Sequence, residues 1–223
     1  MWAFFVIEFP PFFNHYLKDK PNPELPKAYI FETGANEWKK YDQWPPKNTT
    51  EKKLYLHPNG KLSFSPTTTS APAFDEYTSD PAKPVPYTAE IRNIRGSDFM
   101  YEDQRFAAVR PDVLVYETDV LTENVILAGS ILADLRVSIT GTDADFVVKL
   151  IDVLPDNEPN FRNAPKGFQM AGYQRLVRAE VLRGKFRNSF EKPEPFEPGK
   201  ITSLQLELND VAHTFRKGHK IMI

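Results

Sequence analysis

The feature that most constrains how this chain can fold is the alternation of apolar and polar residues in its second half. In ILADLRVSIT, residues 131–140, every second side chain is apolar and most of those between are polar. SLQLELND, residues 203–210, repeats the pattern with leucines at alternate positions. Successive side chains of a β-strand point to opposite faces, so a period of two puts one face in a core and the other in water. These segments therefore predict half-buried strands.

Further segments from residue 112 onward show a similar pattern, separated by Gly, Pro, Asn and Asp. Their spacing is typical of a β-sandwich. We predict strands at 113–118, 123–129, 131–140, 144–154, 172–184, 200–212 and 219–223. Upstream, 28–32 predicts a short strand, and KKLYLHPNGKLSFS predicts a hairpin that turns at Pro58-Asn59-Gly60. The long segment 65–104 has little periodicity and is expected to be an irregular loop.

The N-terminal region predicts a short helix from about residue 11 to residue 17, with proline near its first turn. The segment Phe4–Lys18 holds more aromatic side chains than one amphipathic face needs, so we expect this helix to be buried against something larger. At the other end, HKIMI begins a strand pattern that then stops. The chain is therefore expected to be cut at both ends. Glu8 and the following prolines argue against a signal peptide.

Charge and composition exclude several classes of partner. The formal net charge is −2, and no basic face is evident that would bind nucleic acid or an anionic membrane. No apolar stretch approaches the ~20 residues that a membrane-spanning helix needs. The chain has no cysteine, which rules out disulfides, thiolate metal sites and a cysteine nucleophile. We expect a soluble protein, whose location in the cytoplasm or outside it the composition does not decide.

Motifs for self-contained catalysis are missing. The sequence has no GxSxG elbow, no SxxK, no HExxH and no glycine-rich phosphate loop. His213 and His219 are six residues apart across a turn, which is not a typical metal-ligand spacing, so we expect them to form hydrogen bonds at strand ends. We therefore predict no catalytic residue, no metal and no cofactor.

The stretch SITGTDADFVVKLIDVLPD raises the question of a carboxylate cluster. It contains Asp143, Asp145, Asp152 and Asp156, which could be ligands or catalytic groups. On a strand, the odd separation of Asp145 and Asp152 sends their side chains to opposite faces. We therefore interpret the stretch as a solvated turn followed by a buried strand.

Three aromatic residues form a second candidate site. Trp38, Tyr41 and Trp44 follow one another at intervals of three in NEWKKYDQWPP. Exposed together, they could stack on a sugar, which would make the chain a stand-alone carbohydrate-binding β-sandwich module. The interpretation we favour is that they anchor this linker to the core.

Several segments, taken in order, carry a family resemblance. They are IEFPPFFNHYLK, FETGANEWKKYDQWPP, MYEDQRFAAVRPDVLVYETDVL, GTDADFVVKLIDVLPD and AHTFRKGHKIMI. Together they resemble the C-terminal region of cocaine-esterase-like serine hydrolases. This group includes α-amino-acid ester hydrolases, glutaryl-cephalosporin acylases and, more distantly, X-prolyl dipeptidyl peptidases.

The resemblance implies a mainly β fold, a jelly-roll (galactose-binding-like) β-sandwich with a short N-terminal helix left from an α/β-hydrolase domain. Residues 1–27 would be the end of that hydrolase domain, helix and linker, and 28–223 a sandwich truncated at its C-terminus. The Ser-Asp-His triad would lie in the hydrolase domain, so the chain alone is expected to be inactive. Its expected partners are that domain and, through oligomer contacts, further copies.

The same resemblance implies a role for the segment 113–116. In the family, the matching segment approaches the acyl pocket of an enzyme that acts on esters or amides. Leu114 and Val115 are therefore candidate pocket walls; the alternative is that they are ordinary core residues. The parent enzyme is expected to be bacterial and either cytoplasmic or exported.

Overall fold

The computed structural model describes residues 9–68, 74–90, 93 and 96–223. The described chain is mainly β, as the alternation predicted. Its strands are β1 (Ala28–Glu32), β2 (Glu37–Tyr41), β3 (Tyr55–His57), β4 (Lys61–Ser63), β5 (Val125–Val137), β6 (Asp145–Val153), β7 (Gln174–Arg183), β8 (Thr202–Phe215) and β9 (Lys220–Met222). The helical elements are α2 (Phe9–Lys18), α3 (Arg105–Ala108) and the 3₁₀ turns η1 (Pro58–Gly60), η2 (Asp98–Met100) and η3 (Gly184–Phe186). No helix in these ranges has the length and apolarity of a membrane span.

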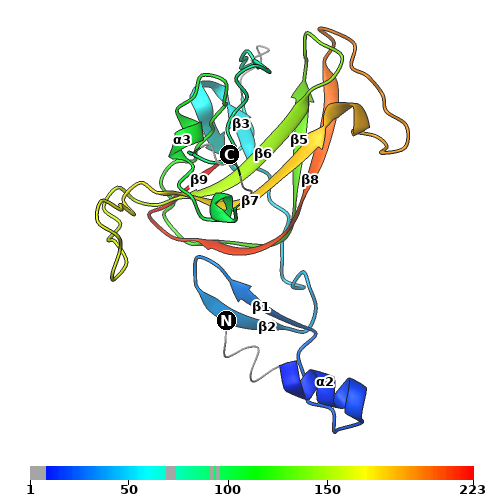
Figure 1. Cartoon of the computed structure of the whole chain (residues 1–223), viewed down its shortest axis with the longest axis vertical. Helices are drawn as coiled ribbons and strands as arrows, with labels where there is room; N and C mark the ends of the chain where they lie inside the picture. Colours follow the sequence, from blue (N-terminus) through cyan, green and yellow to red (C-terminus); the bar gives the residue numbers. More distant parts are fainter. Residues whose placement is uncertain (1–8, 69–73, 91–92, 94–95) are drawn as a thin grey trace.

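The strands form a sandwich-like body with two main layers (Figure 1). In one layer, β5 pairs antiparallel with β8. In the other, the order is β7-β6-β9, again antiparallel. Glu117 extends this second layer, because it bridges Lys61 of β4 on one side and Met222 of β9 on the other. The β3–β4 hairpin thereby joins the sheet that contains β6.

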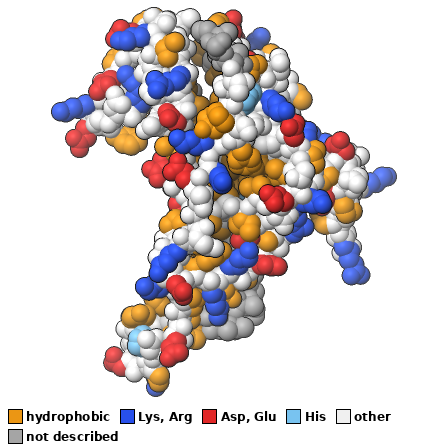
Figure 2. All heavy atoms as spheres, turned by 180° about the vertical axis from the view of Figure 1, so that it is seen from behind, with side chains coloured by type: hydrophobic (Ala, Val, Ile, Leu, Met, Phe, Trp, Pro, Cys, Tyr) orange, Lys and Arg blue, Asp and Glu red, His pale blue; other side chains and the backbone are white. Residues whose placement is uncertain are grey.

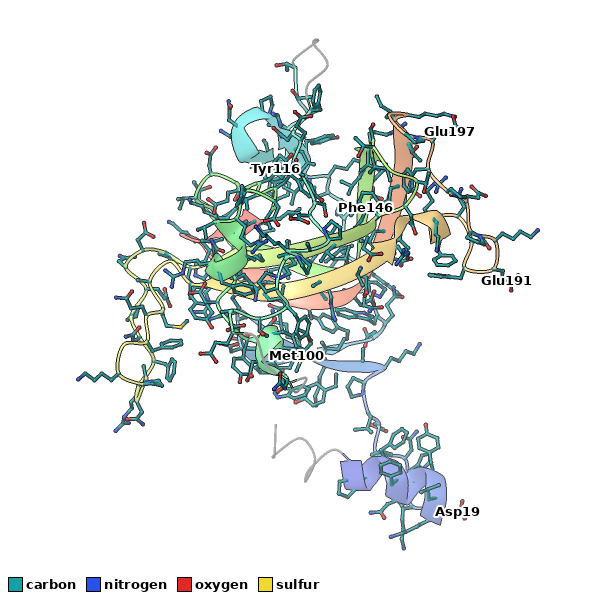
Figure 3. All side chains as sticks on the ribbon, turned by 45° about the horizontal axis from the view of Figure 1, so that its top comes forward. Asp19, Met100, Tyr116, Phe146, Glu191 and Glu197 are labelled. Atoms are coloured by element: carbon teal, nitrogen blue, oxygen red, sulfur yellow. The ribbon has the colours of Figure 1, made fainter. Side chains whose placement is uncertain are left out.

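The core lies between the layers and confirms the period of two. Leu204, Leu206 and Leu208 of β8 are buried, and they form a cluster with Leu182 of β7 and Phe196. The alternate residues 131, 133, 135, 137 and 139 pack against this cluster. Figure 3 shows the side chain of Phe146 among the strands, whereas Glu191 and Glu197 lie on the outer loops. Burial of one apolar face of each layer is the main stabilising contribution of this fold.

The sequence predicted two strands at 123–129 and 131–140, but the structure has a single strand, β5, with a bulge. The pairing with β8 runs from Gly129↔Val211 to Ile131↔Leu208, so the register shifts at this point. Gly129 has φ +122, a conformation that L side chains rarely adopt. The bulge bends both strands, and β8 visibly curves beneath the body in Figure 1. Gly129, which the sequence pattern placed at the junction of two strands, therefore marks a bulge within one strand.

Two further predictions need correction. A regular strand over 113–118 is absent; this segment makes ladder-like contacts only around Glu117. Conversely, 37–41 was assigned to a linker and is the strand β2, paired residue by residue with β1. EWKKY is too polar to show an alternating pattern, and it forms a strand because β1 offers it an edge. The predicted helix at 11–17 is confirmed within α2, and the predictions at 28–32 and 52–65 are also confirmed.

The helix α2 and the β1–β2 hairpin form an extension below the sandwich (Figure 1). Exposed aromatic side chains on α2 include Phe12, Phe13 and Tyr16. Figure 2 shows hydrophobic side chains mixed with charged ones over this extension. Phe4 and Phe5, which contributed to the predicted aromatic helix, lie outside the described residues.

The β1–β2 hairpin docks on the end of β8 through its turn. The Thr33 amide donates to the Ala212 carbonyl at 3.0 Å, and the Thr214 amide donates to the Thr33 carbonyl at 2.9 Å. Gly34 follows with φ +80, and a Cβ added there would lie 2.0 Å from the Thr214 carbonyl oxygen. Only glycine permits this approach of backbone to backbone.

Candidate functional site

The segment 113–118, whose start was the candidate pocket wall, is held rigidly from its middle onward. Tyr116 and Ile223 exchange amide-to-carbonyl hydrogen bonds, both of 2.9 Å. Glu117 donates its amide to the Gly60 carbonyl and accepts from the Leu62 amide, each at 2.8 Å. The segment is thus clamped between β4 and β9, so its first residues project from a fixed base.

The two candidate wall residues differ in their surroundings. Val115 packs against the buried cluster of Ile151, Val153 and Met222. Leu114, next to it, is 38% exposed. Leu114 is therefore the residue whose side chain can contact another domain or a ligand, because the side chain of Val115 packs in the core.

The same segment fixes part of the long loop 65–104. The Tyr116 hydroxyl donates to Asp75 Oδ2 at 2.7 Å, and burial together with this carboxylate raises the pKa of Tyr116 strongly. Arg110 makes a two-pronged contact with Asp112, at 2.8 and 2.6 Å, and also donates to the Lys83 carbonyl at 3.2 Å. The described part of the loop is thus irregular, as predicted, but is tied to the body at these points.

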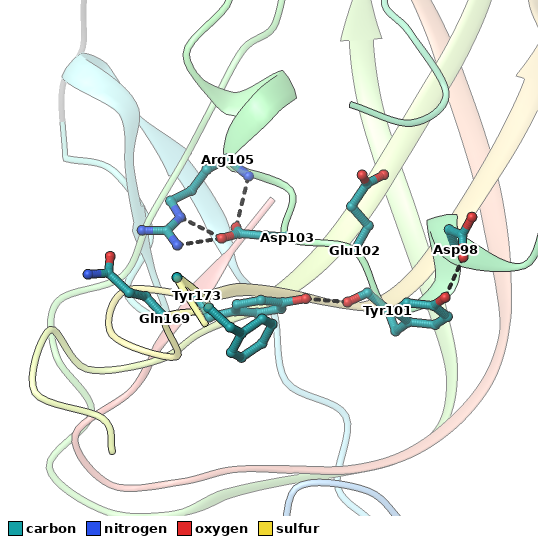
Figure 4. Close-up of a pocket in the computed structure, with 9 residues that line it drawn as sticks. Asp98, Tyr101, Glu102, Asp103, Arg105, Gln169 and Tyr173 are labelled. Atoms are coloured by element: carbon teal, nitrogen blue, oxygen red, sulfur yellow. Dashed lines mark hydrogen bonds and ion pairs between the residues drawn. The ribbon is translucent and has the colours of Figure 1, made fainter. Parts of the chain in front are cut away.

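A cavity of about 470 Å³ lies beside α3, where the end of this loop meets the segment that precedes β7 (Figure 4). Its lining residues are Asp98, Tyr101, Glu102, Asp103, Arg105, Gly167, Phe168, Gln169 and Tyr173. No sequence motif predicted this cavity; the only signal was the length of loop 65–104.

Hydrogen bonds within the lining account for much of its polarity. Arg105 Nε donates to Asp103 Oδ2 at 2.7 Å, a bond that raises the pKa of the guanidinium. The Tyr173 hydroxyl donates to the Tyr101 carbonyl, and burial raises the pKa of Tyr173. The lining has no serine, histidine or lysine; its ionisable side chains are the carboxylates of Asp98, Glu102 and Asp103, the guanidinium of Arg105 and the phenols of Tyr101 and Tyr173.

A half-buried lysine lies behind this region. Lys149 Nζ donates to Gln104 Oε1 at 2.8 Å and lies 5.6 Å from the centre of the Phe106 ring. Burial lowers the pKa of Lys149, because the charged form loses solvation. Gln104 is itself almost fully buried and donates to the Glu102 carbonyl at 2.8 Å. This lysine pins the α3 segment to β6.

The aromatic trio does not share one surface. Trp38 pairs with Phe31 across the hairpin and contacts the rings of Tyr29 and Phe31, at 5.1 and 5.5 Å between centroids. Tyr41 is an odd number of residues from Trp38 on β2, so its side chain lies on the opposite face, with its ring 5.6 Å from that of Trp44.

Trp44 also contacts the sandwich. Its Nε1 donates to Asp210 Oδ2 of β8 at 2.5 Å. Trp44 therefore ties the linker to the sandwich, which is the kind of contact that the anchoring interpretation expects.

Asp145 and Asp152 lie apart, as strand parity predicted, whereas Asp143 and Asp145 both contact Arg183. Asp143 accepts from Arg183 Nε at 2.7 Å and from the Lys185 amide at 3.0 Å. Burial alone raises the pKa of Asp143, but the bonds and charges of Arg183 and Lys185 together outweigh burial, and the pKa is lowered. Asp145 and Asp156 are exposed, whereas Asp152 is fully buried.

Asp152 joins the two histidines that the sequence analysis considered as a pair. Its Oδ1 lies 2.7 Å from His219 Nδ1, and its Oδ2 lies 3.4 Å from His213 Nε2. The signal that could have revealed this cluster was an aspartate within the apolar run FVVKLIDVL, because a buried carboxylate needs partners. Among the described side chains, no group of three or more is arranged to hold a metal ion.

The comparison with family models decides what kind of domain this is. Residues 23–223 match the model of the X-Pro dipeptidyl-peptidase C-terminal non-catalytic domain. The chain belongs to this family. The resemblance expected from its motifs is thus confirmed.

Relatives of this non-catalytic domain family include complete hydrolases. Cocaine esterase from Rhodococcus sp. (strain MB1 Bresler) is 29% identical over 95% of this chain, which spans 36% of that protein. An aminopeptidase from the marine sediment archaeon Thaumarchaeota archaeon is 41% identical, with a TM-score of 0.89 over 99% of this chain and 36% of that structure. An α-amino-acid ester hydrolase is 38% identical, with a TM-score of 0.87 over 99% of this chain and 37% of that structure.

These relatives are about three times as long as the region they share with this chain. The chain therefore spans little more than a third of each of these relatives.

Proposed function

We propose that this chain is the C-terminal β-sandwich portion of a serine hydrolase that acts on ester or amide substrates, acyl or peptidyl. Its contribution is to pack against an α/β-hydrolase domain and to shape the substrate pocket. We further propose that the sandwich has jelly-roll topology. The observation that carries the proposal is the match of 23–223 to a non-catalytic domain whose relatives are esterases and an aminopeptidase.

Acyl transfer in such an enzyme would use a serine nucleophile, a histidine base and an oxyanion hole, all supplied by the hydrolase domain. The exposed Leu114, on a segment clamped between β4 and β9, supports a role as an apolar wall near the acyl group. The aromatic surface of α2 supports a packing role, since large exposed apolar side chains are typical of interfaces.

The first test uses the chain alone. We expect no turnover of p-nitrophenyl acetate and no shift in melting temperature with sugars. Turnover that a serine-directed inhibitor abolishes would contradict the assignment of catalysis to another domain. Sugar binding that Trp44→Ala abolishes would favour a carbohydrate-binding module instead.

The second test uses the polypeptide expressed together with the coding region upstream of Met1. We expect esterase or amidase activity there, and Leu114→Ala is expected to shift kcat/KM several-fold toward bulkier acyl groups. The matched control is Val120→Ala, an exposed apolar residue on the same connecting segment. Equal acyl preference in both variants would contradict the pocket-wall role.

A further inference from the structure

The buried cluster of Asp152, His213 and His219 connects three separate parts of the chain. Asp152 belongs to β6, His213 to β8, and His219 immediately precedes β9. Their exposed fractions are 0%, 1% and 7%. On its other side, His213 Nδ1 lies 2.8 Å from the Thr33 hydroxyl, at the turn of the β1–β2 hairpin. The cluster therefore reaches from the sandwich core to the docked hairpin.

The Thr33 hydroxyl has two partners but only one proton. Its oxygen lies 3.1 Å from the Ala212 carbonyl oxygen and 2.8 Å from His213 Nδ1. If His213 is neutral with its proton on Nε2, facing Asp152, then Nδ1 must accept, and the hydroxyl proton is used there. If His213 carries both protons, Nδ1 donates to Thr33, and the hydroxyl proton is free to bond Ala212.

Charged groups face His213 from the elements packed against it. Asp152 faces it from β6, with Oδ2 3.4 Å from Nε2; burial raises the pKa of that carboxyl, but its contacts with both histidines together outweigh burial and lower the pKa. His219 contacts the other carboxylate oxygen. On the hairpin side, Glu32 contacts Thr214 and is neutralised by Lys39 at 2.7 Å, with Tyr41 behind it. The carboxylate of Asp152 is thus the counter-ion that His213 meets directly.

Protons can reach this network from the solvent. Thr33 is exposed, while His213 is not. The His213 ring also makes a T-shaped contact with the Phe215 ring, with 4.6 Å between the centroids. When the protonation of His213 changes, the Thr33 hydroxyl can rotate to change its hydrogen-bond partner.

We propose that His213 is a proton-linked latch for the β1–β2 hairpin. Its second proton converts the contact to Thr33 into a charge-assisted hydrogen bond and releases the hydroxyl to bond Ala212. The hairpin then holds more tightly to β8 when His213 is protonated and more loosely when it is neutral. This property belongs to the fold itself and does not rest on the proposed hydrolase function.

The test is amide hydrogen exchange measured by NMR on the whole chain. It is carried out between about pH 8 and about pH 5.5, a range in which histidine titrates. The reporters are the Thr33 and Thr214 amides, which cross the docking contact. The Leu206 amide within the β5–β8 layer serves as the reference for global opening. We expect protection at the docking amides to rise by roughly 5- to 10-fold relative to the reference as pH falls, the value of one additional hydrogen bond.

Two variants at the same exposed position separate the latch from general pH effects. Thr33→Val removes the hydroxyl at nearly constant volume, and we expect it to abolish the pH dependence. Thr33→Ser keeps the hydroxyl, and we expect this variant to retain the pH dependence. Equal pH dependence in Thr33→Val and the unaltered chain would overturn the proposal, as would protection that does not change with pH. Nitrogen shifts showing that His213 stays neutral at the lower pH would overturn it as well.

Discussion

Gly34→Ala is the substitution for which the structure predicts the sharpest effect. Gly34 lies in the turn of the β1–β2 hairpin with φ +80, and its α-carbon faces the backbone of β8. A methyl group there would lie 2.0 Å from the Thr214 carbonyl oxygen and 2.9 Å from its carbon. Because the contact is with backbone, no side-chain rotation can relieve it, so the hairpin must move away from β8.

The cost has two parts. An alanine in left-handed conformation costs about 1–2 kcal/mol by itself. Retreat of the hairpin also breaks the hydrogen bonds at 3.0 and 2.9 Å between Thr33 and the strand, each with a net value of about 1 kcal/mol. We therefore expect Gly34→Ala to lower the free energy of unfolding by about 3–4 kcal/mol.

The assay is urea denaturation followed by circular dichroism, with stability obtained from the midpoint and slope. The matched control is Gly199→Ala, where φ is +75 and nothing lies within 4 Å of the added Cβ. This control has the conformational strain without the collision and should lose only about 1–2 kcal/mol. Equal losses in the two variants would refute the reasoning that contact with Thr214 makes Gly34 necessary.

Three further perturbations test the core and the charges. Leu204→Ala should cost about 2–5 kcal/mol in urea melts, because the side chain is fully buried, whereas Ile201→Ala, at 71% exposure, should cost less than about 0.5 kcal/mol. Gly184→Ala should cost about 1–3 kcal/mol by the same assay, since its Cβ would lie 2.5 Å from the Phe196 ring; full stability would show that the ring moves freely. Burial raises the pKa of Glu32, but bonds from its partners outweigh it and the folded pKa is lowered; the stabilisation is therefore present above the unfolded pKa and lost as pH falls through the folded one. Glu32→Gln should accordingly cost about 2 kcal/mol near pH 7 and little near pH 3, so a pH-independent cost would contradict the ion-pair explanation.

The mainly β character of the fold could be predicted because its main determinant is local. Alternation in 131–140 and 203–210 depends only on which face of a strand is buried, and the structure buries that face. The boundaries of the strands were harder to predict from the sequence. The bulge at Gly129 is set by the partner strand β8, and β2 exists because β1 provides an edge, so neither is a property of its own segment.

The candidate sites show the same limit. Strand parity correctly separated Asp145 from Asp152, since parity is local. The meeting of Asp152 with His213 and His219 depends on β6, β8 and the start of β9 lying side by side, which the sequence spacing of these residues does not reveal. The cavity beside α3 is likewise built from two segments that are far apart in the sequence, 98–105 and 167–173, and has no continuous motif.

The docking of the hairpin on β8 sets the order in which this protein can mature on the ribosome. Thr33 and His213 are 180 residues apart, so the hairpin is synthesised long before the strand that receives it. At 5–20 residues per second, that interval is roughly 10 to 40 s. During this time the turn at Thr33 has no β8 backbone to bond, and unpaired strand edges readily join other chains. The charges on Lys39 and Lys40 of β2 lie in this hairpin and would discourage such pairing until β8 emerges.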